Sequence, residues 1–134
     1  MIRLIPVVLM LMALAAPQTA RAEESNDENA KIEIVASLWC DTAVQLETVL
    51  RAHYTDKVPL PRAMAEINRL SPEACIVARA IVNPGAEVKR VTAGDNVMSL
   101  RSARVHGIMR GGYALMMTPQ TWYFVRIVAE LVPL

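Results

Sequence analysis

Two cysteines are the residues of this chain best suited to nucleophilic or redox chemistry. Cys40 stands in the string Trp39-Cys40-Asp41-Thr42, just before an expected helix, and a helix N-terminus favours a reactive thiolate. Redox enzymes of this kind usually carry a Cys-x-x-Cys pair, but residue 43 is alanine. The sequence therefore favours a structural disulfide between Cys40 and Cys75, with a small thiol enzyme as the alternative.

Neither histidine stands in a pattern that assigns it to catalysis. His53 falls on the apolar side at the end of an expected helix, where it would pack in the core or, as a cation, interact with the helix dipole. His106 precedes Gly107 in expected β-structure, and only long-range contacts would bring a nucleophile to it. We expect no catalytic residue, and a small hydrolase is the alternative.

The spacings typical of metal and phosphate sites are absent from the sequence. No His-x-His or Cys-x-x-Cys pair is present, whereas structural zinc needs four such ligands. Met109, Met116 and Met117 would suit copper(I) through their thioether sulfurs, but methionines beside a hairpin are more typical of a core. The 5 glycines match neither Gly-x-Gly-x-x-Gly nor the P-loop. We expect neither a metal nor a cofactor.

A basic and aromatic surface is the remaining candidate for a site. If Trp122 to Leu131 is a strand with its odd-numbered residues in the core, Trp122, Phe124 and Arg126 share the opposite face. Hairpins nearby would complete the expected surface, which consists of Arg101, Arg104, Arg110, Tyr113, Trp122, Phe124 and Arg126. It would suit a carboxylate-bearing ligand or an acidic protein. In the alternative, a second layer covers the aromatic rings and the arginines are solvated.

The start of the chain has the layout of a secretory signal peptide. Arg3 is followed by an apolar run from Leu4 to Ala16 and by the small-residue site Ala20-Arg21-Ala22. The run is short for a membrane span, which needs about 20 residues. We therefore expect residues 1–22 to be removed, with an uncleaved anchor as the alternative. The mature protein would be periplasmic or secreted and would have no membrane span.

Charge argues against a general nucleic-acid or anionic-membrane partner. Without the 2 arginines of the signal peptide, 12 Lys and Arg remain against 13 Asp and Glu, a net charge of −1. Residues 23–75 carry 10 acidic and 5 basic side chains, whereas residues 76–134 carry 3 and 7. This asymmetry marks either a binding face or two halves of one domain that attract each other.

The mature chain has the length of one domain, residues 32–134, after a flexible acidic tail at 23–31. Alternation from Ile32 to Cys40 predicts a strand. Thr42 and Gln45 have capping-box spacing at the start of a helix that runs to His53. A second helix is expected from Leu60 to Leu70, with Pro61 in its first turn.

The second half of the chain predicts β-structure. Turns are expected at Asn83-Pro84-Gly85-Ala86, at Gly94-Asp95-Asn96 and at Arg110-Gly111-Gly112. The segment from Val97 to Met109 is ambiguous, because Arg101 and Arg104 interrupt the apolar pattern of a strand and also that of a helix. We favour a bulged strand there. Trp122 to Leu131 also favours a strand, although Thr118-Pro119 would suit the start of a helix.

These elements together predict an α+β fold. One strand and two helices precede a small antiparallel sheet or partly open barrel, whose strand order the sequence leaves open. A bridge between Cys40 and Cys75 would close a loop of about 36 residues, which stabilises a fold by about 3–4 kcal/mol. Export places such a bridge where disulfides persist.

Four short strings carry a resemblance to other proteins: Trp39-Cys40-Asp41-Thr42, Ala65-Glu66-Ile67-Asn68, Ala74-Cys75 and Pro119-Gln120-Thr121-Trp122. The chain resembles small exported bacterial proteins of unassigned function. This resemblance covers most of the mature domain. It implies a disulfide between the paired cysteines and β-structure in the second half. It implies no activity and no site.

We therefore expect a non-catalytic binding or interaction module of the cell envelope, whose partner is a protein or a small anionic ligand. An inhibitor of an envelope enzyme is the alternative to a simple binding module. An inhibitor needs a protruding loop, and Arg110 to Gln120 is the candidate segment.

Overall fold

The computed structural model describes residues 31–130 and, for Glu130, the backbone alone. Its elements are β1 (Glu33–Cys40), α2 (Ala43–Tyr54), α3 (Leu60–Leu70), β2 (Cys75–Ala93), β3 (Asn96–Arg110) and β4 (Tyr113–Glu130). The expected order of one strand, two helices and an antiparallel sheet is confirmed. The predicted signal peptide, the acidic tail up to residue 30 and Leu131 lie outside the described residues.

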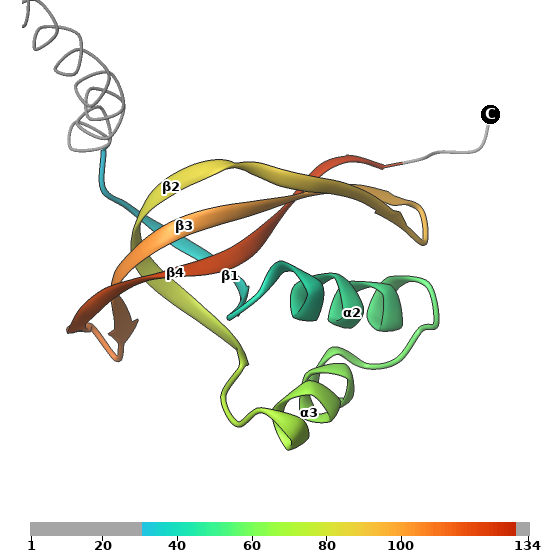
Figure 1. The fold of residues 1–134 in the computed structure, drawn as a ribbon, viewed down its shortest axis with the longest axis horizontal. Helices are drawn as coiled ribbons and strands as arrows, with labels where there is room; N and C mark the ends of the chain where they lie inside the picture. Colours follow the sequence, from blue (N-terminus) through green and yellow to red (C-terminus); the bar gives the residue numbers. More distant parts are fainter. Residues whose placement is uncertain (1–30, 131–134) are drawn as a thin grey trace, which may run out of the picture. The chain divides into compact units, whose positions relative to one another are not determined.

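The four strands form one antiparallel sheet that closes on itself (Figure 1). Its order is β1-β2-β3-β4, and β1 also pairs with β4. This closing contact is short, because only Trp39 pairs with Phe124 and Cys40 with Tyr123. From Glu33 to Leu38, β1 pairs with β2 alone. The partly open barrel expected from the sequence is thus closed at the end of β1 that carries Cys40.

The expected turn at Asn83-Pro84-Gly85-Ala86 is wrong, because β2 runs through these residues as one long strand. The register with β3 shifts here, since Pro84 pairs with Ala103 and Glu87 with Arg101. Three steps of β2 therefore face two of β3, which is a β-bulge. Proline has no N–H to donate and fits such an irregularity. A Cβ on Gly85 would lie 2.9 Å from the carbonyl oxygen of Ser102, so the close approach of β3 requires glycine.

Thr118-Pro119 does not start a helix, because β4 continues from Tyr113 to Glu130. Val105 pairs with Gln120 and Gly107 with Met116, so extra residues of β4 bulge out around the proline. The prediction of a bulged strand for Val97 to Met109 is confirmed, because β3 has one extra residue opposite β2 between Val105 and Gly107. The favoured strand prediction from Trp122 onward is confirmed as far as Glu130.

The predicted helix caps are present where the sequence places them. The Thr42 hydroxyl accepts a hydrogen bond from the Gln45 amide at 3.1 Å, and the Gln45 side chain accepts one from the Thr42 amide at 3.1 Å. This reciprocal pair satisfies two N–H groups that the helix itself leaves unpaired. Pro61 occupies the first turn of α3, where its missing N–H costs nothing.

Each face of the sheet has its own core. The first core lies under the helices, which sit on the same side of the sheet (Figure 1), and includes Leu38, Leu46, Val49, Met98 and Leu100. The second core lies on the opposite face, which closure turns inward. It takes at least one residue from every strand: Trp39, Ala80, Val82, Ala103, Val105 and Phe124. The closing pair of Trp39 and Phe124 is its centre, with ring centroids 4.8 Å apart.

Candidate functional site

The expected disulfide between Cys40 and Cys75 is present. The two residues face each other in the β1–β2 register, and each is only 1% exposed. Because no cysteine is free, neither sulfur is available as a nucleophile in this state. The junction before α2 is therefore a buried covalent link rather than an accessible thiol site.

The two histidines lie in different parts of the fold. His53 is at the end of α2, and its Nδ1 is 2.8 Å from the carbonyl oxygen of Val58. A carbonyl only accepts, so Nδ1 carries the proton and donates it. His106 lies in β3, with its Nε2 in contact with the side-chain oxygen of Asn83. Neither ring contacts a serine, threonine or cysteine through a hydrogen bond within the described part of the chain.

The predicted basic and aromatic surface is divided by the way the sheet curves. Phe124 is fully buried, and Trp122 is half-buried against Trp39, with ring centroids 6.4 Å apart. Both rings belong to the second core or pack against it. The inward turn of this face therefore provides the second layer that the sequence allowed as an alternative for the aromatic rings.

The arginines of that predicted surface fall into separate places. Arg101 and Arg126 share the inward face with Phe124, since Arg101 pairs with it in register and Arg126 follows it by two. The Arg101 guanidinium donates to the Gly85 carbonyl, and the Arg126 guanidinium lies 5.4 Å from the Phe124 ring centroid. Arg104 pairs with Thr121 and so lies on the opposite face.

Arg110 and Tyr113 meet at the far end of the β3–β4 hairpin, where they pair in register. Tyr113 is 75% exposed, and the hairpin also exposes Leu115 and Met116. We call Arg110, Tyr113, Leu115 and Met116 the hairpin tip. The tip belongs to the segment that the sequence marked as a candidate protruding loop.

The structure contains a cavity that the sequence did not predict. It has a volume of about 390 Å³ and lies between the helices and the sheet, and we call it the helix–sheet cavity. Every element contributes to its wall, which consists of Ala36, Ser37, Leu38, Leu50, His53, Tyr54, Leu60, Val77, Met98, Val125 and Ile127. The wall is therefore mostly aliphatic, with three side chains that carry polar atoms.

Those three side chains differ in how many of their polar atoms already make hydrogen bonds within the protein. The Ser37 hydroxyl lies 3.1 Å from the Leu38 carbonyl and 3.4 Å from the Val125 carbonyl, so it is used within the sheet. His53 uses Nδ1, which leaves Nε2 without a hydrogen-bond partner among residues 31–130. The Tyr54 ring packs edge-on against His53 at 4.7 Å, and its hydroxyl makes no hydrogen bond within that range. His53 and Tyr54 can thus still bind a polar group of a ligand.

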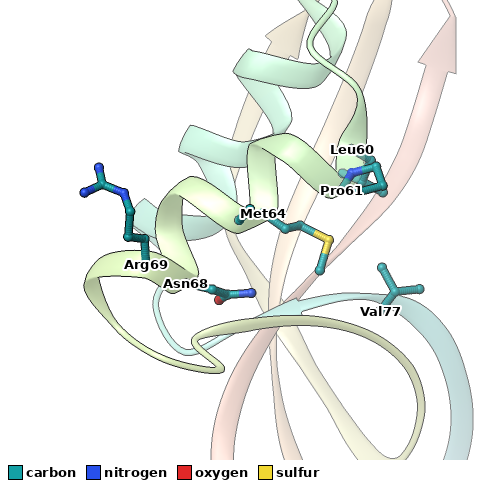
Figure 2. A pocket seen from close by; sticks show the side chains of 7 residues that line it. Leu60, Pro61, Met64, Asn68, Arg69 and Val77 are labelled. Carbon is teal, nitrogen blue, oxygen red and sulfur yellow. The ribbon is translucent and has the colours of Figure 1, made fainter.

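A second hollow lies beside α3, and we call it the α3 groove. Leu60, Pro61, Met64, Ala65, Asn68, Arg69 and Val77 line it. Figure 2 shows the Met64 side chain extending from α3 toward Val77, while the Arg69 guanidinium points away from Val77. Leu60 and Val77 line both hollows, so the groove and the cavity meet at these two residues.

Sequence reasoning missed the cavity because its wall comes from six elements that are distant in the chain. Its one local signal is Ala36 in β1, a small side chain between the larger Ile34 and Leu38 on the same strand face. Small residues in a strand leave space under a packed helix, but whether other side chains fill that space depends on long-range contacts.

Within residues 31–130, no group of three or more His, Cys, Asp and Glu side chains is arranged to hold a metal ion. Neither α2 nor α3 has the length and apolar content of a membrane-spanning helix. Comparison with known proteins finds no match to a family model, a curated protein or a solved structure.

Proposed function

We propose that this chain is a non-catalytic binding module of the bacterial cell envelope and that the helix–sheet cavity holds a small, mostly apolar ligand. The location rests on the signal-peptide pattern at residues 1–22 and on the resemblance to small exported proteins. The Cys40–Cys75 disulfide supports it, because disulfides persist in oxidising compartments.

The single observation that carries the proposal is the composition of the cavity wall. Ligand sites are concave, about 300–1,000 Å³ in volume, mostly apolar, and equipped with a few polar groups. The helix–sheet cavity has about 390 Å³, an aliphatic wall and the unengaged polar atoms of His53 and Tyr54. Because all six elements meet there, the fold as a whole keeps this space open.

A binding role is also supported by what surrounds the candidate nucleophiles. The two sulfurs are joined and buried. His53 is oriented by a backbone carbonyl, and the Ser37 hydroxyl points to backbone atoms of β4. General base catalysis would need a nucleophile in hydrogen-bond reach of an imidazole.

The proposal is tested with N-phenyl-1-naphthylamine, an uncharged probe whose fluorescence rises in apolar sites. The mature protein should bind this probe in the micromolar range. Ala36→Leu places extra volume in the cavity and should weaken binding at least tenfold. Ala114→Leu, the same change on the exposed hairpin, is the matched control and should bind as the unmodified protein does. Absence of probe binding, or equal binding by both variants, would contradict the proposal.

The hairpin tip supports a second candidate function, inhibition of an envelope enzyme. Its exposed apolar side chains lie close to two arginines in the sheet register: Arg110 pairs with Tyr113 and Arg79 with Met109, and both arginines are exposed and make no ion pair within residues 31–130. Unpaired arginines beside an exposed tyrosine suit an acidic cleft of a protein.

If the hairpin tip inhibits an envelope enzyme, the mature protein should bind that enzyme, lower its activity and release it at high salt, because salt screens the arginines. A variant carrying Arg110→Glu and Tyr113→Ala should lose the inhibition, whereas Ala36→Leu should keep it. Inhibition that survives the hairpin substitutions would exclude the tip as the inhibitory element.

A further inference from the structure

Resting on the proposed function, the geometry points to one class of ligand: a linear aliphatic carboxylate of the fatty-acid type. We infer that its carboxyl group is bound by His53 and Tyr54. Its chain passes between Leu60 and Val77 and extends from the helix–sheet cavity into the α3 groove.

The shape of the site favours a long chain over a compact molecule. The cavity and the groove share Leu60 and Val77, so the two hollows adjoin at these residues, and a ligand that contacts both must be elongated. Val77 remains 62% exposed although it stands on the helix-facing side of the sheet. An exposed valine at the junction of two apolar hollows is explained if an aliphatic chain covers it.

The lining of the groove suits a flexible chain. Met64 extends across it toward Val77 (Figure 2), and an unbranched thioether adapts to the conformation of an aliphatic partner. The charged member of the lining, Arg69, points away from Val77 and lies 3.3 Å from the Glu66 carboxylate. Five of the seven lining residues are apolar, so the groove offers mostly apolar contact.

The chemistry of the cavity favours a carboxyl group at one end of the ligand. The Nε2 atom of His53 and the hydroxyl of Tyr54 make no hydrogen bond to another described residue. Their rings pack edge-on, with centroids 4.7 Å apart, and both residues line the same cavity. A carboxylic acid accepts from the tyrosine hydroxyl through one oxygen and gives its own proton to the lone pair at Nε2, which forms a carboxylate paired with an imidazolium.

Chain length is the decisive measurement. Octanoate and palmitate are compared by displacement of N-phenyl-1-naphthylamine, together with the compact carboxylate 1-adamantanecarboxylate. Each buried methylene changes affinity by roughly fourfold, so palmitate should bind at least tenfold more tightly than octanoate. The compact carboxylate should bind more weakly than palmitate.

Two variants test where the aliphatic chain passes and whether His53 binds the carboxyl group. Val77→Trp narrows the junction and should reduce the preference for palmitate over octanoate to less than threefold. Val44→Trp, at a somewhat more exposed valine on α2 outside both hollows, should keep the full preference. His53→Phe keeps a ring but removes both nitrogens, and should weaken palmitate more than it weakens the uncharged probe.

The outcomes separate this inference from the proposed function. Probe binding without a preference for palmitate, or a preference that Val77→Trp leaves intact, overturns the linear-chain inference while the binding function stands. Absence of binding by the probe and by all three carboxylates overturns both.

Discussion

Asn68 of α3 pairs with the backbone of Cys75 as a neighbouring strand would. Its side-chain nitrogen donates to the Cys75 carbonyl at 2.9 Å, and its side-chain oxygen accepts from the Cys75 amide at 2.8 Å. Both backbone groups of Cys75 therefore point away from β1. The register pair of Cys40 and Cys75 is thus a non-hydrogen-bonded pair, which agrees with its Cα–Cα distance of 4.1 Å.

Asn68→Ala should destabilise the fold by about 1–3 kcal/mol. It leaves a partly buried amide and carbonyl without partners at the first residue of β2. The free energy of unfolding in urea measures the effect. Arg69→Ala, the next residue, has a side chain that is 67% exposed and should change stability by less than about 0.5 kcal/mol. Equal effects of the two substitutions would contradict a specific role for the Asn68 amide.

The disulfide should stabilise the domain by about 4 kcal/mol, because it closes a long loop in the unfolded chain. Both cysteines are 1% exposed, so a thiol reductant should act at a rate that follows unfolding rather than reductant concentration. Urea titrations of the native protein and of a Cys40→Ala, Cys75→Ala variant measure the contribution of the disulfide to the free energy of unfolding. Rapid reduction of the folded protein, linear in reductant, would contradict the burial of the bridge.

Ser37 extends the closure of the sheet beyond the two backbone pairs of β1 and β4. Its hydroxyl lies 3.5 Å from the Val125 amide and 3.4 Å from the Val125 carbonyl. Ser37→Ala should therefore raise the hydrogen-exchange rate of the Val125 amide at least fivefold. The Phe124 amide, in the backbone-paired part of β4, should change much less. Unchanged exchange at Val125 would show that the hydroxyl does not hold the strands together.

Local features of this fold were predictable from the sequence because short-range chemistry determines them. The capping box at Thr42 and Gln45 is set by residues three apart. The turn at Gly111 and Gly112 is set by two glycines with positive φ, which side-chain-bearing residues rarely adopt. The disulfide was predicted from the signal-peptide pattern and from the presence of only two cysteines.

Closure of the sheet was not predictable, because it joins residues far apart in the chain. The pairing of Trp39 with Phe124 turns one sheet face inward, and this buries a ring that alternation alone assigned to an outer face. Pro84 led to a wrong turn prediction for a related reason, and Pro119 left a helix start open as the alternative to a strand. Each lies in a bulge of a long strand, and only the register with β3 distinguishes such a bulge from a turn.

The attachment of α2 to β2 should depend on pH through Glu47. Its carboxylate lies 2.7 Å from the Lys89 ammonium and 2.8 Å from the Arg51 guanidinium. The bond from Lys89, followed by the bond from Arg51, holds the pKa of Glu47 below its ordinary value of 4.5. A lowered pKa in the folded state means that this stabilisation is present above pH 4.5 and is lost as the pH falls through the lowered pKa.

Glu47→Gln should therefore cost less than about 1 kcal/mol at pH 7, since the cationic partners are half-exposed and solvent screens the pairs. The difference from the unmodified protein should shrink toward zero as the pH falls through the lowered pKa of Glu47, because the folded protein then loses the charge on this carboxyl group. Urea titrations of both proteins between pH 7 and pH 3 measure it. Glu66→Gln is the matched control, because the Glu66–Arg69 pair is two-thirds exposed and joins residues of one helix. A difference for Glu47→Gln that stays constant across this range would show that the lost interaction is packing rather than charge.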